Sequence, residues 1–554
     1  MLSYRKLAMR VLGRPLHTGG GIDSPRPASQ RAAALVLTAA MLTTFTAPAF
    51  AKTWYIEDGD ITISASETKG TNKVSQGAEP EVEDTGTIIT NREKDASSHT
   101  VTINAGNDKV EVTLDNVNIK ADSGSALISK GDVTLTLKGD NHLTGGNGGS
   151  SSYGGDGITS SGSLTISGGT VTATGGDSTS SVGSGGSGIY SVSGDVTISG
   201  GTVNANGGDG KNGSGGGSGI DSSGGVTVSG GTVTANGGDG GSGSGSHGGN
   251  GIYSSGGVTI SSGSTVTANG GDGEDGSGGR GITSNGGVTV SGGTVNAKGG
   301  SGKNGNGGDG IRSFNPVAIS GGTVNANGGN SDYSNGGDGI RSLDHVAISG
   351  GTVKSNGGSG NLSGGNGIIS YDIDLSGSLE LTAKAGSPNG KALSRVGSEL
   401  DLNTIKDKLD PGAKVTATDA DGKVIQQVSI PRPVEPEEPS SSSDSGSATP
   451  SAPASFLPGL TVTDKDGQRI SYTSTQSGNT LTVCVGRFTA SLRISLAALR
   501  QLRAEGIETI TFQTILCSTT LSVDELLAMG GEDAEVVLTH HIRSSTLTVG
   551  GKAV

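Results

Sequence analysis

The chain has 554 residues, of which 104 are glycine; 3% are aromatic and 30% hydrophobic. This composition excludes a globular domain with a conventional large core and leaves disordered chains, fibrous chains and repeat proteins. The net charge is -14, and lysine and arginine do not cluster beyond the N-terminal segment, which disfavours nucleic acid as a partner.

The first 51 residues have the features of an export signal. Basic residues extend to Arg31, the apolar run AAALVLTAAMLTTF covers residues 32–45, and APAFA ends at Ala51. The run is short for a membrane span and is followed by small residues, which favours a cleaved signal peptide over the alternative of a retained anchor. We therefore expect residues 1–51 to be removed, no membrane span after cleavage, and a secreted or extracellular cell-surface location.

The sequence of residues 52–430 predicts a parallel β-helix, with Gly-rich repeats at about residues 147–370. Each repeat reads G-I-x-S, then V-T-[IV]-S-G-G, then T-V-x-A-x-G-G, and ends in a loop of Gly, Ser and Asp. Apolar and polar residues alternate within each motif, which predicts three short strands per coil of about 30 residues. The isoleucines that mark successive repeats are Ile158, Ile189, Ile220, Ile252, Ile282, Ile311, Ile340 and Ile368.

One repeat is too small to bury its own aliphatic side chains, so the core must form between repeats. Val203 has no large aliphatic neighbour in its own stretch, but it stacks between Val171 and Val233 if equivalent strands pair in parallel on successive coils, or rungs. The handedness rule for parallel strand connections predicts a right-handed coil. The fold class is therefore all-β, a right-handed parallel β-helix, followed by a small C-terminal α+β domain.

The corners of the coil carry their own sequence signals. We expect the glycine pairs at 200–201 and 207–208 to supply positive-φ corners between the faces. An asparagine recurs at the end of the third motif and predicts an amide ladder that is interrupted at Lys298. Its members are Asn206, Asn236, Asn269, Asn327 and Asn356.

The two ends of the repeat array are expected to be closed. The segment WYIEDGDITISA at residues 54–65 begins or caps one end, and residues 371–428 close the other, because open ends would expose unpaired strand edges. Residues 431–455 are a Pro/Ser linker, and residues 456–554 form the α+β domain. Within it, Cys484 and Cys517 lie in strand-like segments; an exported location permits a disulfide between them, with two free thiols as the alternative.

The residue after each Gly-Ile pair faces outward, and these residues form a stripe that is the candidate carbohydrate-binding groove. Tyr190 and Tyr253 lie two rungs apart, about 10 Å, a spacing that suits stacking on alternate sugar rings. Asp221 between them can accept hydrogen bonds from hydroxyls, and Arg312 and Arg341 can pair with uronate carboxylates. The alternative is an ordinary solvated face of a repeat. The stripe consists of Thr159, Tyr190, Asp221, Tyr253, Thr283, Arg312, Arg341 and Ile369.

Acidic residues on both sides of the Gly-rich loops are candidate Ca²⁺ ligands, because oxygen donors on adjacent rungs suit this ion. The alternative is that Asp is simply a favoured turn residue. The candidate ligands are Asp156, Asp209, Asp239, Asp272, Asp309 and Asp338.

The segment VTLTLKGDNHLTGG at residues 133–146, followed by repeated GGDGI and VTISGGTV units, resembles a bacterial secreted carbohydrate-binding family whose β-helix is related in fold to pectate lyases. The resemblance covers roughly residues 54–428 and implies non-catalytic binding of a polysaccharide or cell-surface glycan, with Ca²⁺ in the coil turns. The long Gly/Ser loops of this chain depart from that pattern.

These observations predict an exported protein that binds polysaccharide without catalysis, with Ca²⁺ as a possible cofactor. A cell-surface adhesin, or a rigid spacer presenting the C-terminal domain, is the alternative. A polysaccharide lyase is a remote alternative, because such an enzyme needs a base and a charge-stabilising cation at one subsite. The nearest approach to that arrangement is found on two successive coils, in Asp309, Arg312, Asp338 and Arg341.

Overall fold

The computed structural model divides into two compact units, Met1–Glu435 and Pro436–Val554, each described by itself below. The predicted export signal, residues 432–455 of the predicted linker and Cys517 lie outside the described residues, so the predictions for them are untested. The described residues are 52–149, 153–179, 183–243, 245–395, 398–431, 460–464, 468–470, 472–477, 479–485, 489–514, 518–529, 534–540, 545–550 and 552–553.

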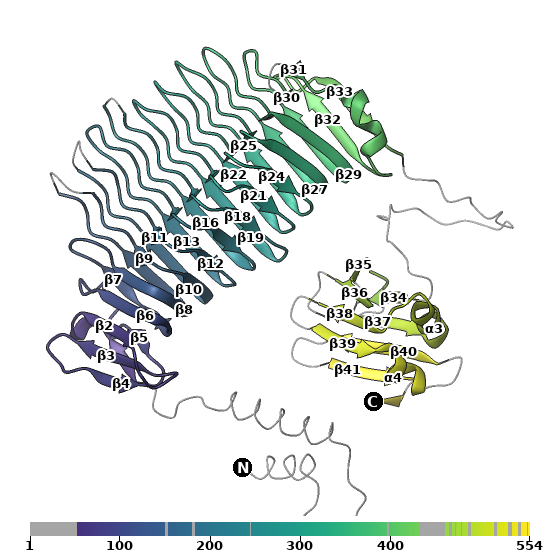
Figure 1. Cartoon of the computed structure of the whole chain (residues 1–554), viewed down its shortest axis with the longest axis horizontal. Coiled ribbons are helices and arrows are strands. Elements are labelled where there is room, and N and C mark those ends of the chain that lie inside the picture. The colour runs from purple at the N-terminus through teal and green to yellow at the C-terminus, as the bar shows by residue number, and fades with distance from the viewer. Residues whose placement is uncertain are drawn as a thin grey trace, which may run out of the picture. The chain divides into compact units, whose positions relative to one another are not determined.

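The first unit is a parallel β-solenoid, which confirms the predicted fold (Figure 1). The strands of the first motif stack on one face: β9 (Ile158–Ser161), β11 (Ile189–Ser193), β14 (Ile220–Ser222), β17 (Ile252–Ser254), β20 (Ile282–Ser284), β23 (Ile311–Ser313), β26 (Ile340–Ser342), β28 (Ile368–Ser370) and β30 (Leu393–Arg395). The second face consists of β12 (Val196–Ile198), β15 (Val226–Val228), β18 (Val258–Ile260), β21 (Val288–Val290) and β24 (Val317–Ile319). The third consists of β13 (Thr202–Asn206), β16 (Gly231–Asn236), β19 (Ser264–Asn269), β22 (Thr294–Lys298) and β25 (Thr323–Asn327). Longer strands span more than one face: β6 (Val101–Asp115), β8 (Leu127–Thr144), β10 (Leu164–Thr174), β27 (His345–Asn356) and β29 (Asp372–Lys384).

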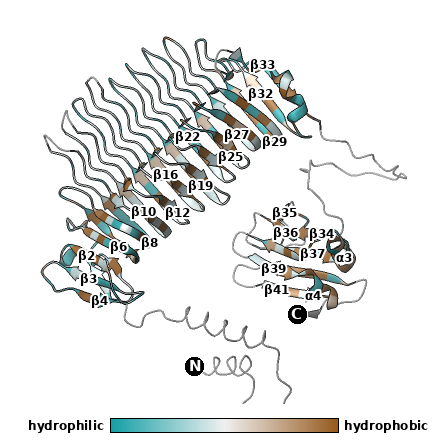
Figure 2. Cartoon of the chain, in the orientation of Figure 1, coloured by the Kyte–Doolittle hydropathy of each residue, from teal (hydrophilic) through white to brown (hydrophobic). Residues whose placement is uncertain are grey.

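The core runs along the axis of the coil, because equivalent residues of successive rungs are direct strand partners. Val203 pairs with Val171 on one side and with Val233 on the other, as predicted, and all three are fully buried. Alternate hydrophobic and hydrophilic bands along the strands show the same periodicity (Figure 2). Each such valine is therefore enclosed by its own copies rather than by its sequence neighbours.

The predicted amide ladder is present at the end of the third face. Asn236 Nδ2 donates to Asn206 Oδ1 at 2.9 Å, and Asn269 continues the row by donating to Asn236 at 2.9 Å. Lys298 pairs with Asn269 in strand register and interrupts the row, as expected. The ladder resumes where Asn356 Nδ2 donates to Asn327 Oδ1 at 2.7 Å.

The Gly-rich loops form an ordered fin along one side of the coil (Figure 1). Each loop runs outward past one glycine and returns past another, for example Gly208 and Gly217. The Gly217 amide donates to the Gly208 carbonyl at 2.8 Å within one coil, and the Gly208 amide donates to the Gly186 carbonyl at 2.8 Å in the coil before. This chain of bonds continues without a break from Gly146 to Gly386. The loops are therefore hydrogen-bonded to one another along the solenoid.

At Gly207 and Gly208, where the fin begins, glycine is needed for close approach and not for backbone conformation. A Cβ added at Gly208 would collide with the carbonyl oxygen of Gly176. Neither Gly207 nor Gly208 has a positive φ, so the prediction that this pair supplies positive-φ corners is wrong. Gly201, with a φ of 79°, does fill that role between the second and third faces. The glycine content thus reflects two different steric requirements.

Both ends of the coil are closed by antiparallel strands, as predicted. At the N-terminal end, β2 (Ile61–Ala65), β3 (Asn72–Gln76) and β4 (Val82–Asp84) pair antiparallel, next to β1 (Thr53–Tyr55), η1 (Ile56–Asp58) and β5 (Ile88–Thr90). The first coils continue through β6, β7 (Asn118–Lys120) and β8. Buried Trp54 donates from Nε1 to Asp84 Oδ2 at 2.8 Å. At the other end, β32 (Lys414–Thr418) pairs antiparallel with β33 (Val424–Ser429), and β30 with β31 (Ser398–Glu399), beside η2 (Leu402–Lys408).

The second unit is α+β, as expected. One sheet has the order β34 (Leu460–Thr463), β37 (Ala490–Ser495), β40 (Glu535–His540), β41 (Ser545–Val549), β42 (Lys552–Ala553). The other has the order β35 (Thr473–Ser477), β36 (Thr480–Cys484), β38 (Thr509–Gln513), β39 (Ser518–Ser522). Ser495 and Ser522 cap the helices α3 (Leu496–Ala504) and α4 (Val523–Ala528).

Candidate ligand-binding groove

The predicted stripe exists as one continuous column on the first face. Tyr190 pairs with Thr159 and with Asp221, and Tyr253 follows Asp221 on the next rung. The register then continues through Thr283, Arg312, Arg341 and Ile369. The structure therefore brings together all five predicted carbohydrate-binding residues along one line of the surface.

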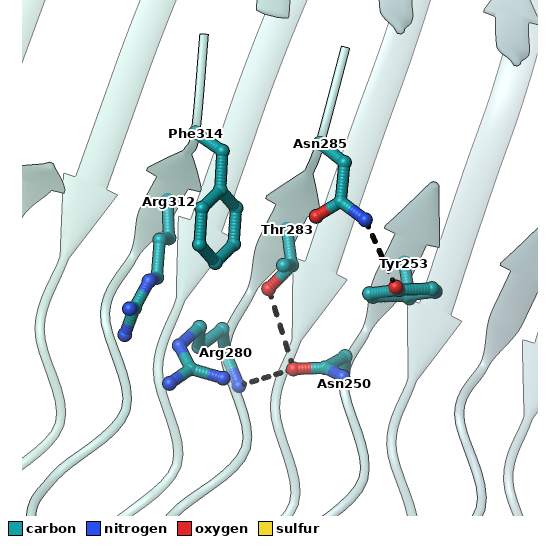
Figure 3. A pocket seen from close by; sticks show the side chains of 7 residues that line it. All are labelled: Asn250, Tyr253, Arg280, Thr283, Asn285, Arg312 and Phe314. Carbon is teal, nitrogen blue, oxygen red and sulfur yellow. Dashed lines mark hydrogen bonds between the residues drawn. The ribbon is translucent and has the colours of Figure 1, made fainter. Parts of the chain in front are cut away.

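The middle of this stripe is hollowed. A shallow depression of about 490 Å³ lies over β17, β20 and β23 and contains two of the predicted residues, Tyr253 and Arg312 (Figure 3). Its two ends are aromatic, with Tyr253 at one end and Phe314 at the other (Figure 3). The residues that line it are Asn250, Tyr253, Arg280, Thr283, Asn285, Arg312 and Phe314.

Hydrogen bonds between neighbouring rungs hold the polar side chains of the depression in place. Asn285 Nδ2 donates to the Tyr253 hydroxyl at 3.2 Å, which fixes the position of the ring. Asn250 Oδ1 accepts from the Arg280 amide at 3.0 Å and from the Thr283 hydroxyl at 3.4 Å. The site is thus preorganised by contacts that the repeat spacing itself creates.

Arg312 is the most constrained cation of the depression. Its guanidinium lies 5.3 Å from the centre of the Phe314 ring, and Nη1 lies 3.7 Å from Asp309 Oδ2. Asp309 Oδ2 also forms an ion pair with Arg280 Nε at 3.6 Å. Burial, together with the neighbouring charges of Arg280 and Arg341, lowers the pKa of Arg312. Its Nε is buried and has no hydrogen-bond partner among the described residues, so one donor of the guanidinium is unused.

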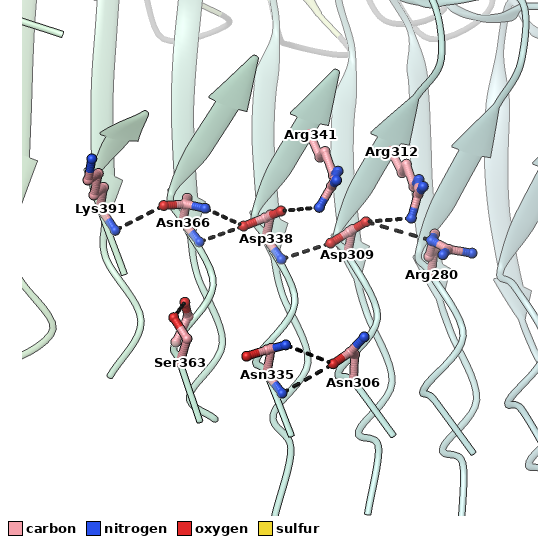
Figure 4. A network of polar contacts seen from close by, with 11 residues as sticks. Arg280, Asn306, Asp309, Arg312, Asn335, Asp338, Arg341, Ser363, Asn366 and Lys391 are labelled. Carbon is pink, nitrogen blue, oxygen red and sulfur yellow. Dashed lines mark hydrogen bonds and ion pairs between the residues drawn. The ribbon is translucent and has the colours of Figure 1, made fainter. Parts of the chain in front are cut away.

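A polar ladder continues from the depression toward the C-terminal end of the coil (Figure 4). The Asp338 amide donates to Asp309 Oδ1 at 2.9 Å, and Arg341 Nη1 lies 3.3 Å from Asp338 Oδ2. Asp338 in turn accepts from the amide and the side chain of Asn366, at 2.6 and 2.9 Å. Burial and the proximity of Asp309 raise the pKa of Asp338 to about 6. Both carboxylates are therefore buried supports for the arginines.

Carboxylates without a neighbouring arginine lie in and beside the N-terminal half of the stripe, whereas the other half contains the arginines. Asp156 accepts from the Ser187 amide at 2.8 Å and from the Thr159 hydroxyl at 2.7 Å, and burial raises its pKa. Asp221 lies between Tyr190 and Tyr253. Burial, with a smaller contribution from Asp156, raises the pKa of Asp221 to about 6. The stripe is thus acidic at one end and basic at the other.

The six predicted Ca²⁺ ligands separate into two columns. Asp156, Asp309 and Asp338 precede the first face, whereas the other three lie on the fin. On the fin, Asp209 Oδ1 accepts from the Asp239 amide at 2.9 Å, and Asp239 Oδ1 accepts from the Asp272 amide at 2.7 Å. Each carboxylate therefore bonds to the next rung, and among the described residues no three acidic, histidine or cysteine side chains are grouped to hold one ion. The calcium prediction therefore stays a prediction.

Four residues of the depression were predicted neither as site residues nor as members of the stripe: Asn250, Arg280, Asn285 and Phe314. Arg280 occupies the position before Gly-Ile that other repeats fill with Ser, Asn or Asp. Asn285 and Phe314 occupy the position after G-I-x-S, where the strand ends. That position also holds exposed Val192 and Tyr371, but at Asn285 and Phe314 it lies past the end of the strand, so alternation did not mark it as outward-facing.

Of the two cysteines in the predicted disulfide, only Cys484 is among the described residues. Cys484 ends β36, is half-buried, and its Sγ donates to Gln513 Oε1 at 3.5 Å. Burial raises the pKa of this thiol. Since Cys517 lies outside the described residues, the pairing stays a prediction.

Comparison with known proteins supports the fold and goes no further. A family model described as Beta helix repeat matches residues 164–188, 196–218, 226–250 and 317–340. Comparisons with curated proteins and with solved structures found no match. In the part of the chain that the structure describes, the helices are too short or too polar to cross a bilayer.

Proposed function

We propose that this chain binds an acidic polysaccharide, without catalysis, along the stripe on the first face of its β-solenoid. The observation that carries the proposal is the depression between Tyr253 and Phe314. Its aromatic ends suit stacking on sugar rings, and Arg280 and Arg312 between them suit the carboxylate of an acidic sugar.

Binding is preferred to catalysis because of the state of the nearby carboxylates. Asp309 and Asp338 are only 6% and 5% exposed and are already paired with arginines. A lyase needs a base that reaches a sugar proton, and these two groups are committed to holding cations in place. They act as positioning residues for Arg312 and Arg341.

Export to the cell exterior is part of the proposal and is supported by residues 1–51 of the sequence. Calcium stays a prediction that a chelator can check: binding of the glycan should be compared with and without the ion. The adhesin or spacer alternative predicts no glycan affinity in the first unit and retention on cells that depends on the region after Phe456.

Removing the arginines tests the proposed function. We expect the double variant Arg280→Gln/Arg312→Gln to lose about ten- to 100-fold in affinity for polygalacturonate, measured by calorimetry, because two charge-assisted contacts disappear. Since these changes also disturb Asp309, Phe314→Ala provides a second test: this exposed side chain can be removed without opening the core, and a loss of several-fold is expected.

The matched control is Arg493→Gln, which removes an ion-paired arginine from the second unit and should leave affinity unchanged. Unchanged affinity in both groove variants would contradict the proposed function.

A further inference from the structure

The acidic half of the stripe contains a side chain that the fold does not need. Asp221 is the middle residue of the three-residue strand β14, where it caps no helix and closes no turn. Aspartate is unfavourable in strands, and equivalent positions on the other rungs of the stripe hold Thr, Tyr, Arg or Ile. Among the described residues, no donor bonds to its carboxylate and no cation pairs with it. Its oxygens are not among the buried unpartnered atoms of the described residues, so this half-buried carboxylate reaches the surface and is open to a partner from outside.

The surroundings of Asp221 favour a cation. Tyr190 lies on the preceding rung and Tyr253 on the following rung, each about 4.8 Å away along the column. The Tyr253 ring is held in place by Asn285. Asp156 is close enough to repel the charge of Asp221. Two aromatic rings that flank a carboxylate attract a positive group through their π-faces as well as through its charge.

We propose that Asp221, between Tyr190 and Tyr253, forms a binding site for a positively charged amine on a sugar ligand, such as the amino group of a non-acetylated amino sugar. A neutral hydroxyl would hydrogen-bond the carboxylate but would gain little from the rings. An amine on a sugar is favoured over an amine on a peptide because the site continues directly into the depression proposed above to hold sugar rings. The choice of a sugar as the carrier of the amine therefore rests on the proposed function.

The site is separate from the arginines. Asp221 and Arg312 are three rungs apart, about 14 Å. Among the described residues, the ionisable groups near Asp221 are Tyr190 and Tyr253 on the adjoining strands and Asp156, which precedes the first face, and none of them is a cation. The amine site can therefore be tested without changing the arginine site.

The experiment uses the full chain and two sugar hexamers of the same linkage. The first is N,N,N-trimethylated glucosamine, whose charge does not depend on pH, and the second is N-acetylglucosamine. We expect the cationic hexamer to bind at least tenfold more tightly at pH 7.5, and this advantage to disappear as the pH falls below 6, when Asp221 takes up a proton. Asp221→Asn should abolish the advantage.

Equal binding of the two hexamers, or an advantage that survives in Asp221→Asn, would overturn the amine site. A lysine hexamer that binds as tightly as the cationic sugar would overturn the assignment to a sugar. The arginine variants with polygalacturonate test only the proposed function, whereas the two hexamers and Asp221→Asn test the amine site. Failure of the proposed function can therefore be told from failure of the amine site.

Discussion

The fin is held together by backbone contacts that leave no room for a side chain, and one methyl group tests this. In Gly208→Ala, the new Cβ collides with the carbonyl oxygen of Gly176. Overpacking of this kind costs about 1–3 kcal/mol. Two hydrogen bonds meet at Gly208, one through its amide and one through its carbonyl, and distorting both adds about 1 kcal/mol each. Allowing for the lower chain entropy that alanine brings, we expect the fin to lose about 2–4 kcal/mol.

Gly200→Ala is the matched control, because a Cβ there meets no atom within 4 Å and its φ is not positive. That variant should be neutral or slightly stabilised. Hydrogen exchange is the suitable assay, since repeat arrays unfold in parts and a global midpoint can hide a local change. We expect protection of the fin amides to fall by about 30- to 700-fold in Gly208→Ala, the equivalent of that energy. Equal protection in the two variants would refute close packing of the fin.

Further predictions concern the core, the cap and the groove. Val203→Ala should destabilise the solenoid by about 2 kcal/mol in urea unfolding, because it removes two buried methyl groups and leaves a cavity; a change below about 0.5 kcal/mol would contradict rung-to-rung stacking. Trp54→Phe leaves buried Asp84 without its indole donor and should cost about 1–3 kcal/mol, measured as a lower melting temperature of the first unit; an unchanged temperature would show that the cap does not need this bond. Asp221→Asn should stabilise the folded state at pH 8 by at most about 3 kcal/mol and have no effect at pH 3.5. The native carboxyl, with a pKa of about 6 against 3.8, holds its proton longer than the unfolded one, so stability falls as the pH rises between these values. A stabilisation that persists at pH 3.5 would contradict this reasoning.

The solenoid could be predicted because apolar and polar residues alternate within each repeat and so mark its strands. Alternation places Val203 and its copies on one face, and the repeat length then determines which copies become neighbours. The asparagine ladder follows from the same register, including its interruption at Lys298. Side chains that recur at a fixed spacing therefore carry enough information to fix their own contacts.

The fin could not be predicted in the same way, because glycine has no side chain to show which property is being used. Gly201 adopts a positive φ, whereas Gly208 accommodates a neighbouring carbonyl, and the two look alike in sequence. The depression was found only in part for a related reason. Phe314 and Asn285 lie just past the ends of their strands, where alternation no longer tells which way a side chain points.

The most direct test of the groove is to change the charge of the ligand and nothing else. The full chain would be titrated calorimetrically with polygalacturonate and with the same polymer fully methyl-esterified, which keeps the sugar rings and linkages but removes every carboxylate charge. If Arg280 and Arg312 bind an acidic sugar between Tyr253 and Phe314, esterification should weaken binding at least tenfold, and added salt should narrow the difference. Equal affinity for the two polymers, or affinity for neither, would contradict an acidic-glycan groove.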